Sequence, residues 1–207
     1  MAASEVSQRT RWLHEVRVQV VAVDSAISEA VEKTETPTLD RFLVRLSDAA
    51  NGSHLWLVTA GAVALVAGPR GRRAASEAVA SIALASAVSN LALKSITRRR
   101  RPQAVNGQVV PSRRVRTPTS PSFPSGHAAS AFAFASTMGE EVPATWGPLH
   151  LAASLVAYAR VHTGVHYPSD VVAGALIGAM SGSIVRRLAG RLAPQPGKAS
   201  AGHVTVG

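Results

Sequence analysis

The segment VVAGALIGAMSGSIV, residues 171–185, is an apolar run whose only polar side chains are two serines. Gly174, Gly178 and Gly182 follow one another in it at four-residue steps. On a helix these steps share one face, and small residues at this spacing let two helices approach closely in a bilayer. A chain rich in glycine and alanine also produces this spacing through composition alone, so the pattern leaves both interpretations open. In either case the run predicts an apolar helix.

Four further apolar segments precede this run, at residues 55–67, 74–93, 128–138 and 149–159. Only residues 74–93 reach the ~20 residues that cross ~30 Å of hydrocarbon, although most of the others reach a plausible span when flanking Gly, Ser, Thr and Pro are included. Runs of this size also occur as buried helices of soluble proteins. Charged residues, however, make up only 16% of the chain, against roughly 25% in soluble domains. We therefore predict an all-α transmembrane helical bundle of about five spans.

The N-terminal part carries more charge and shows a different pattern. Between residues 13 and 31 apolar side chains recur at three- and four-residue steps, with charged residues such as Asp24 on the other side. This predicts an amphipathic helix that ends near Pro37, and a second, shorter one follows with Leu39, Leu43 and Leu46 on one face. We expect amphipathic N-terminal helices in residues 1–50, a membrane-embedded domain in 51–192 and a disordered tail in 193–207.

Composition restricts the possible partners. The chain has no cysteine, so disulfides, thiolate nucleophiles and cysteine-bound metals are excluded. Its net charge of +10 suits either nucleic acid or the flanks of membrane spans. Only nine aromatic residues occur, and none lies within the arginine run 98–101, so a base-stacking surface has little support. We expect the bilayer as a partner and no nucleic acid.

Three polar clusters stand at the ends of apolar segments: KSITRRRRP at residues 94–102, SFPSGHAAS at 122–130 and ARVHTGVHYPSD at 159–170. Each has an ordinary explanation when taken alone. An arginine run after an apolar helix often anchors topology or forms a solvated turn, and Pro-Ser-Gly before a helix is a common turn with Ser125 as cap. His162 receives no role. Taken together, the three clusters indicate one ligand.

That ligand is a phosphate group. Lys94, Arg101 and Arg160 offer a point charge and two planar forks, which are the donors that suit phosphate oxygens. The backbone N–H groups of Ser125, Gly126 and His127, at a helix N-terminus, add an anion-binding nest. Gly126 lets the backbone approach the anion closely. Because no carboxylate cluster accompanies these residues, positive side chains must neutralise the phosphoryl charge, and we expect neither a metal nor another cofactor.

Two histidines supply the chemistry. Asp170, which caps the last apolar helix, would hold one ring N–H of His166 and leave the other nitrogen free to attack phosphorus. His127, on the opposite loop, would then protonate the leaving alcohol.

The same residues resemble the three signatures of the type 2 phosphatidic acid phosphatase superfamily, which also includes vanadium haloperoxidases and bacterial non-specific acid phosphatases. The resemblance covers roughly residues 90–182 and implies a helical bundle with metal-independent hydrolysis through a phosphohistidine. It assigns His166 as nucleophile, Asp170 as its orienting residue and His127 as general acid. It assigns phosphate binding to Lys94, Arg101, Ser125, Gly126 and Arg160. Two departures are Ala159, where the third signature commonly has Ser, and about five spans instead of six.

We therefore predict an integral membrane phosphatase acting on a lipid phosphate or diphosphate of the phosphatidate, phosphatidylglycerophosphate or polyprenyl phosphate type. One alternative keeps the pocket and changes the chemistry to that of a vanadate-dependent haloperoxidase. Another is a basic, non-catalytic protein that binds membranes or nucleic acid. The sequence decides neither the lipid nor the oligomeric state.

The distribution of Lys and Arg predicts which side of the bacterial-type cell membrane, the inner membrane, the active site faces. With five spans, the N-terminal region and the loops that carry Lys94 and His166 share one side, and fifteen of the 22 Lys and Arg residues lie there. No apolar run follows the first basic residues, so the N-terminus is not a secretory signal. By the positive-inside rule, the active site is expected on the cytoplasmic side.

Overall fold

The structure, a computed structural model, describes residues 2–102 and 110–192. Within these ranges the chain is helical and contains no strand, which confirms the predicted all-α class. The predicted tail of residues 193–207 lies outside the described residues, as does part of the long loop after Arg101.

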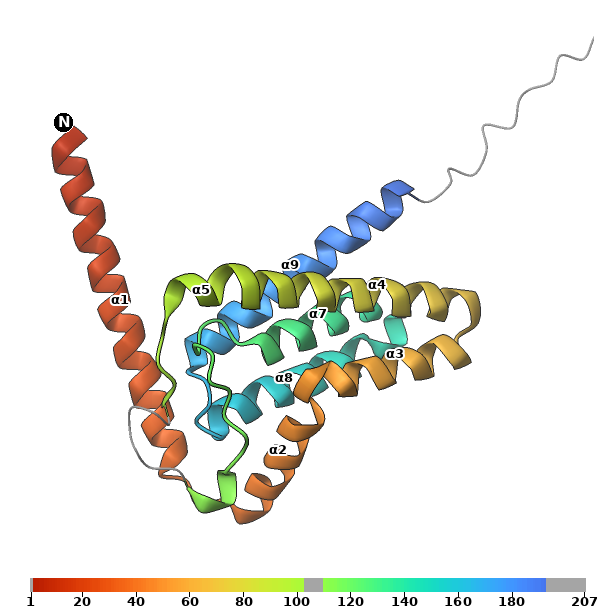
Figure 1. Cartoon of the computed structure of the whole chain (residues 1–207), viewed down its shortest axis with the longest axis horizontal. Helices are drawn as coiled ribbons and strands as arrows, with labels where there is room; N and C mark the ends of the chain where they lie inside the picture. The colour runs from red at the N-terminus through yellow and green to blue at the C-terminus, as the bar shows by residue number, and fades with distance from the viewer. Residues whose placement is uncertain (1, 103–109, 193–207) are drawn as a thin grey trace, which may run out of the picture.

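Each of the five predicted apolar segments is a helix, and together these helices form the elongated body in Figure 1. They are α3 (His54–Val66), α4 (Gly68–Ala87), α7 (Gly126–Glu141), α8 (Trp146–His162) and α9 (Pro168–Leu192). After α4 the chain continues as a π-helical stretch, η2 (Val88–Leu93), and then as the short α5 (Lys94–Thr97). Such π-helical stretches are rare and often occur beside functional sites.

Helix α7 is central and packs against α4, α8 and α9. Helix α7 meets the glycine face of α9 through backbone atoms. A methyl group added at Gly174 would lie 2.4 Å from the carbonyl oxygen of Ser125, and one added at Gly178 would lie 2.3 Å from that of Ala129. Both distances are too short for any side chain, so the glycine spacing in α9 is confirmed as a close helix–helix contact.

The core between α3, α4, α7 and α8 combines many alanines with a few large side chains. Trp56 and Phe134 are buried with their ring centroids 5.4 Å apart, and Met138 and Val156 are fully buried in the same cluster. Burial of each such side chain contributes roughly 1.5–3 kcal/mol. This packing fixes the middle of α7 against α3, α4 and α8.

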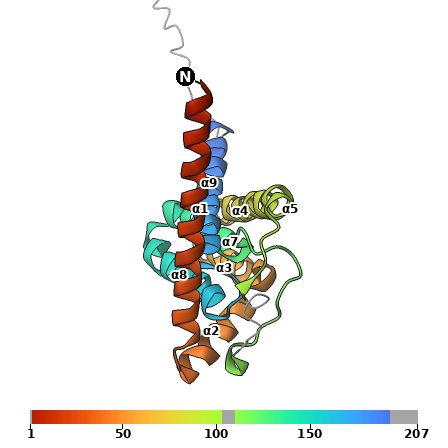
Figure 2. The same ribbon diagram turned by 90° about the vertical axis from the view of Figure 1, so that its left-hand side faces the viewer.

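The N-terminal helices are α1 (Ala2–Glu32) and α2 (Pro37–Ala49), near the predicted bounds. Helix α1 crosses one end of the body, in contact with α8 and α9, and its N-terminal half extends beyond it (Figures 1 and 2). The buried and exposed sides of α1 differ from the amphipathic pattern that the sequence predicts. Asp24, which the sequence placed on the polar side, is only 2% exposed, whereas Leu13 and Val23 are about 60% and 57% exposed. The cause is an ion pair with Arg99, described below.

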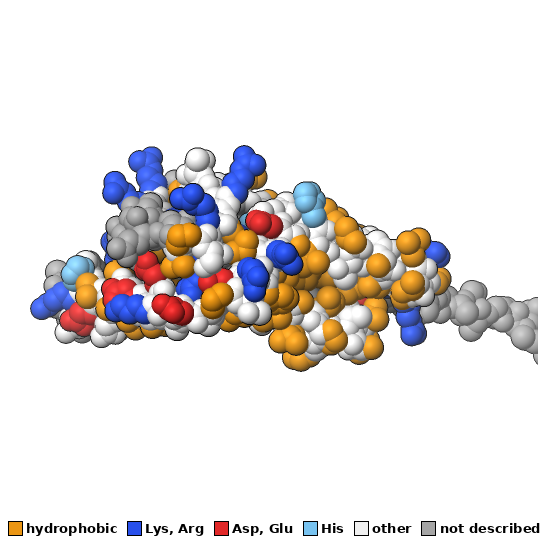
Figure 3. All heavy atoms as spheres, turned by 90° about the horizontal axis from the view of Figure 1, so that it is seen from below, with side chains coloured by type: hydrophobic (Ala, Val, Ile, Leu, Met, Phe, Trp, Pro, Cys, Tyr) orange, Lys and Arg blue, Asp and Glu red, His pale blue; other side chains and the backbone are white. Residues whose placement is uncertain are grey.

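By length and composition, two helices can cross a membrane: residues 68–91 of α4 and η2, and α9. Helices α2 and α3 form a third candidate if the pair, bent by 61°, counts as one span. Helices α7 and α8 have 16 and 17 residues and do not qualify, so about five spans are not reached by this measure. Figure 3 shows apolar side chains gathered over the right-hand half of the body, whereas most Lys and Arg side chains lie over the left-hand half, with a few at the opposite end. The protein is a membrane protein with a few apolar helices.

Candidate active site

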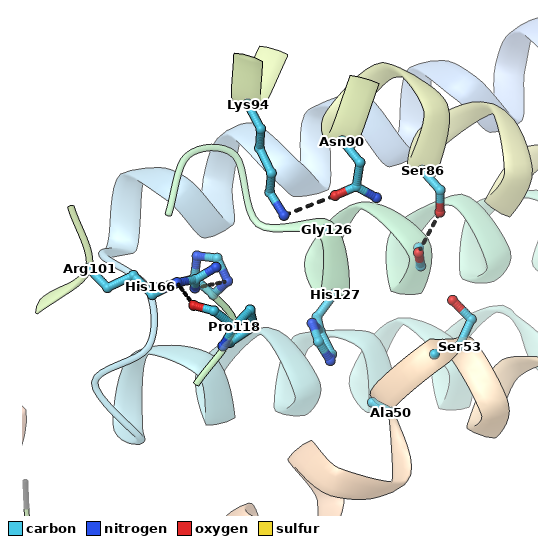
Figure 4. Close-up of a pocket in the computed structure, with 12 residues that line it drawn as sticks. Ala50, Ser53, Ser86, Asn90, Lys94, Arg101, Pro118, Gly126, His127 and His166 are labelled. Carbon is cyan, nitrogen blue, oxygen red and sulfur yellow. Dashed lines mark hydrogen bonds between the residues drawn. The ribbon is translucent and has the colours of Figure 1, made fainter. Parts of the chain in front are cut away.

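A pocket of about 170 Å³ opens where α5, the start of α7 and the turn between α8 and α9 meet (Figure 4). It brings together residues from all three motif clusters. Its lining consists of Ala50, Gly52, Ser53, Ser86, Asn90, Lys94, Arg101, Pro118, Gly126, His127, Ser130 and His166. Five of the predicted site residues therefore line one pocket, and the other three, Ser125, Arg160 and Asp170, are buried beside it.

The N-terminus of α7 forms one wall. Ser125 is the N-cap, and its hydroxyl accepts from the backbone N–H of Ala128 at 3.4 Å, as predicted. The backbone N–H of Ser125 donates to the carbonyl oxygen of Asp170 at 2.9 Å, so α9 holds this turn in place. The prediction that this N–H belongs to the anion-binding nest is therefore wrong, because the donor is already used within the protein. A methyl group added at Gly126 would lie 3.9 Å from Lys94 Nζ. It would meet no clash with protein but would enter the pocket beside the lysine.

The three predicted cations, Lys94, Arg101 and Arg160, differ from one another in their contacts and burial. Lys94 Nζ donates to Asn90 Oδ1 at 2.9 Å at the pocket edge. Arg101 is anchored by backbone: its Nη1 donates to the carbonyl oxygen of Val165 at 2.9 Å. Arg160 is 1% exposed and donates from Nη1 to Ser47, while its buried Nε and Nη2 have no hydrogen-bond partner within the described residues. Unsatisfied buried donors call for an anion nearby.

His166 lies between an arginine and a carboxylate. Its Nε2 is 3.2 Å from Arg101 Nη1, and its Nδ1 is 3.6 Å from Asp170 Oδ2, beyond normal hydrogen-bond length. Asp170 was predicted as the cap residue of α9. It is instead the third residue of the helix, and its Oδ2 accepts from the backbone N–H of Tyr167 at 2.9 Å, in the manner of a capping box. The carboxylate thus faces both the helix start and the imidazole.

His127 also lines the pocket, and its Nε2 is 2.9 Å from Asn51 Oδ1. Asn51 belongs to the short η1 (Asn51–Ser53), which separates α2 from α3. Figure 4 shows the two histidines approaching the pocket from different elements.

Burial and positive neighbours determine the protonation of the site. Burial first, then the charges of Arg101 and Arg160, lower the pKa of His166 to about 4. Burial, followed by the same two arginines, also lowers the pKa of Lys94. His166 is therefore a neutral imidazole at neutral pH, with a lone pair available, inside a cluster of cations.

A second charged network lies behind Asp170. Arg99 Nη1 donates to Asp170 Oδ1 at 2.7 Å, and its Nη2 donates to Asp24 Oδ2 at 2.6 Å. The backbone N–H of Ser169 donates to Asp24 Oδ1 at 2.9 Å, and the Arg99 guanidinium lies 4.2 Å from the centre of the Tyr167 ring. Motif spacing does not reveal this network, because Arg99 belongs to an arginine run that is typical of a topology anchor. Nothing in the sequence marks Asp24 as buried.

His162 has a structural role that the sequence did not reveal. Its Nε2 is 2.7 Å from Asp40 Oδ1, which also accepts from Arg113 Nε at 2.9 Å. Arg113 Nη1 donates to the carbonyl oxygen of Val31 at 2.7 Å. This buried cluster joins α1, α2, α8 and the loop before α7, away from the pocket.

Comparison with known proteins agrees with these features. The family model of the PAP2 superfamily matches residues 74–193. A decaprenylphosphoryl-5-phosphoribose phosphatase from Mycobacterium tuberculosis is 42% identical over 148 residues, which cover 67% of this chain and 75% of the relative.

Solved structures share the fold. Aquifex aeolicus LpxE matches with a TM-score of 0.66 at 26% identity, over 78% of this chain and 93% of that chain. A PAP2-type phosphatidylglycerolphosphate phosphatase from Bacillus subtilis matches with a TM-score of 0.65 at 23% identity, over 84% and 88%. The second likeness concerns the fold alone.

The family match spans more than half of the chain and includes all three motif clusters. The predicted superfamily and the predicted class of enzyme, a membrane lipid-phosphate phosphatase, are confirmed. The chain belongs to the PAP2 superfamily.

Proposed function

We propose that the substrate is a polyprenyl-linked sugar phosphate, of the kind named for the Mycobacterium tuberculosis relative, and that its terminal phosphate monoester is hydrolysed through a phosphohistidine. The observation that carries the mechanism is the position of His166. One ring nitrogen faces Asp170, and the other faces the pocket beside Arg101.

The phosphate group enters between Lys94, Arg101 and the backbone N–H groups at Gly126 and His127. These donors neutralise the charge on the equatorial oxygens, and the unsatisfied guanidinium of Arg160 contributes from behind. An anion in the pocket gives Arg101 Nη1 an acceptor other than His166 Nε2, which frees the ring lone pair.

His166 Nε2 then attacks phosphorus, and the bond between phosphorus and the sugar oxygen breaks. His127, protonated in the presence of the bound anion, transfers its proton to that oxygen, so the sugar leaves as an alcohol. Asp170 stabilises the positive charge on the phosphorylated ring through Nδ1–H. In the second step His127 accepts a proton from water, water attacks the phosphohistidine, and inorganic phosphate leaves.

The assay is phosphate release by detergent-purified protein from a panel of lipid phosphates in the presence of EDTA. We expect turnover of the polyprenyl-linked sugar phosphate, inhibition by vanadate and loss of turnover in His166→Ala. Activity that is lost on chelation and restored by Mg²⁺ would contradict the metal-free mechanism. Halide oxidation dependent on added vanadate would favour the haloperoxidase alternative.

The proposed topology has five membrane passes, α3, α4, α7, α8 and α9, because these helices run together along the body in Figure 1. In this arrangement residues 51–192 form the catalytic unit, α1 and α2 lie at the surface that carries the pocket, and that surface is cytoplasmic. Helix α7 is short for a membrane pass, but it lies between α4, α8 and α9 and so crosses the membrane inside the protein rather than in contact with lipid.

Cysteine labelling tests the orientation, since the chain has no native cysteine. Thr117 lies on an exposed loop near the pocket, and Arg72 lies at the start of α4, at the far end of the body. In intact cells a membrane-impermeant maleimide should label Arg72→Cys and not Thr117→Cys. The reverse pattern would place the active site outside.

A further inference from the structure

Three hollows adjoin one another on the surface that carries the active site. The catalytic pocket shares Asn90 and Lys94 with a second hollow of about 400 Å³, which is also lined by Arg98, Ser120 and Pro121. This hollow in turn shares Arg98 with a groove of about 720 Å³ beside α1. Figure 4 shows Asn90 and Lys94 hydrogen-bonded at the edge of the catalytic pocket. Shared lining residues thus link the three hollows in a row, from His166 past Arg98 to α1, and we call this row the path.

The groove at the end of this path combines apolar walls with a basic rim. Helix α1 and the loop before α7 provide the apolar side chains Leu13, Val16, Val20, Val21 and Phe123, and the arginine run and α1 provide Arg17, Arg98, Arg99 and Arg100. Leu13 is 60% exposed and Val20 is 41% exposed, so these apolar side chains are only partly covered by the part of the chain that the structure describes. A long hydrocarbon chain with an anionic group at one end complements both the apolar wall and the basic rim.

Arg98 differs from Arg99 and Arg101 in its contacts, and from Arg100 in lining two of the hollows. Arg99 is paired with Asp24 and Asp170, and Arg101 is held by backbone carbonyls. Arg98 is exposed and, within the described part of the chain, forms no ion pair. Its backbone has a left-handed conformation with φ of 44° that ends α5 and turns the chain. The side chain lines both the middle hollow and the groove, so it is the cation available between the cleaved phosphate and the apolar wall.

We propose that this path is a binding site for a lipid with two phosphates, in which a phosphodiester separates a long apolar chain from the group that carries the cleaved phosphate. The terminal phosphate occupies the catalytic pocket, a pentose-sized group occupies the middle hollow beside Asn90 and Ser120, the diester binds Arg98, and the hydrocarbon chain lies along α1. This inference rests on the proposed function. It adds a determinant that distinguishes such lipids from those with a single phosphate.

The first test is the variant Arg98→Gln, assayed with a polyprenyl-phosphoryl pentose phosphate. We expect KM to rise about tenfold with kcat nearly unchanged, because one charge-assisted contact to the diester is lost. The inhibition constant of vanadate, which reports on the catalytic pocket alone, should change by less than about twofold. Arg116→Gln is the matched control, since Arg116 is an exposed arginine of the same loop that lines none of the three hollows.

The second test concerns the hydrocarbon chain. Val20→Asp should raise KM for a long-chain substrate and leave a short-chain analogue unaffected, because a carboxylate in the groove opposes apolar contact. Val18→Asp is the control, since Val18 is exposed on α1 but does not line the groove.

The outcomes separate this inference from the proposed function. Three results would overturn the diester site. Arg98→Gln could change KM and the vanadate inhibition constant equally, or change neither of them. Alternatively, Arg116→Gln could reproduce the change in KM. If Val20→Asp leaves the difference in KM between long-chain and short-chain substrates unchanged, the groove does not bind the hydrocarbon chain. In all of these cases wild-type turnover would persist. Absence of vanadate-sensitive phosphate release from any lipid or aryl phosphate by the wild type would instead refute the proposed function.

Discussion

The contact between α7 and α9 and the contact of α1 with the body are built in opposite ways. In the first, Gly174 and Gly178 let two backbones meet, and no space remains for even a methyl group. In the second, a buried carboxylate, Asp24, pairs with Arg99, and the apolar side chains of α1 stay exposed. The first contact places the start of α7, with the backbone N–H groups of Gly126 and His127, against α9. The second reaches the site through the charge that Arg99 shares with Asp170 and through Ser169, whose backbone N–H donates to Asp24, so it should be alterable without loss of the fold.

The largest effect is expected at the glycine contact. Gly178→Ala places a methyl group 2.3 Å from the carbonyl oxygen of Ala129, which should destabilise the protein by about 3 kcal/mol or more and reduce activity with it. Thermal unfolding in detergent measures the change. Gly190→Ala is the control, because a methyl group there meets nothing within 4 Å. Equal stability of the two variants would show that α7 and α9 do not meet as described.

A smaller and different effect is expected at α1. Asp24→Asn removes the charge that pairs with Arg99, so Arg99 shifts toward Asp170 and weakens the carboxylate's hold on His166. We expect kcat to fall about tenfold with KM nearly unchanged, and some thermal stability to be lost because a buried ion pair is broken. Glu29→Gln, on the exposed side of α1, should have no effect. A loss of stability without a change in kcat would limit Asp24 to a structural role.

The smallest effect is a change in protonation. Burial and the charges of Arg101 and Arg160 lower the pKa of His166 to about 4. The ring is therefore neutral above that pH and gains a proton only as the pH falls through it. A bound vanadate adds negative charge and should raise this pKa, which ring-labelled histidine NMR can follow at pH 4–7. A His166 titration near 6.5 without ligand, unmoved by vanadate, would contradict the cationic character of the pocket.

The sequence was sufficient to predict each apolar helix and five of the residues that line the pocket, because periodicity and motif spacing are local properties. It also predicted Ser125 as a cap and the glycine spacing of α9 as one of two interpretations. The position of Asp24 was not predictable, since a charged residue on an amphipathic helix normally faces solvent. Its burial depends on Arg99, which lies 75 residues away along the chain. The same holds for His162, whose partner Asp40 lies on α2.

The central claim, that His166 carries the phosphoryl group, is tested most directly by trapping the intermediate. Wild-type protein and His127→Ala are incubated with substrate labelled in the terminal phosphate, denatured at alkaline pH, digested and mapped by mass spectrometry. We expect acid-labile phosphate on the peptide that contains His166. With a labelled aryl phosphate, whose leaving group needs no proton, we expect more of it in His127→Ala, because that variant then lacks only the base for the second step. Phosphate on any other residue, or none in a variant that still turns over slowly, would contradict the account.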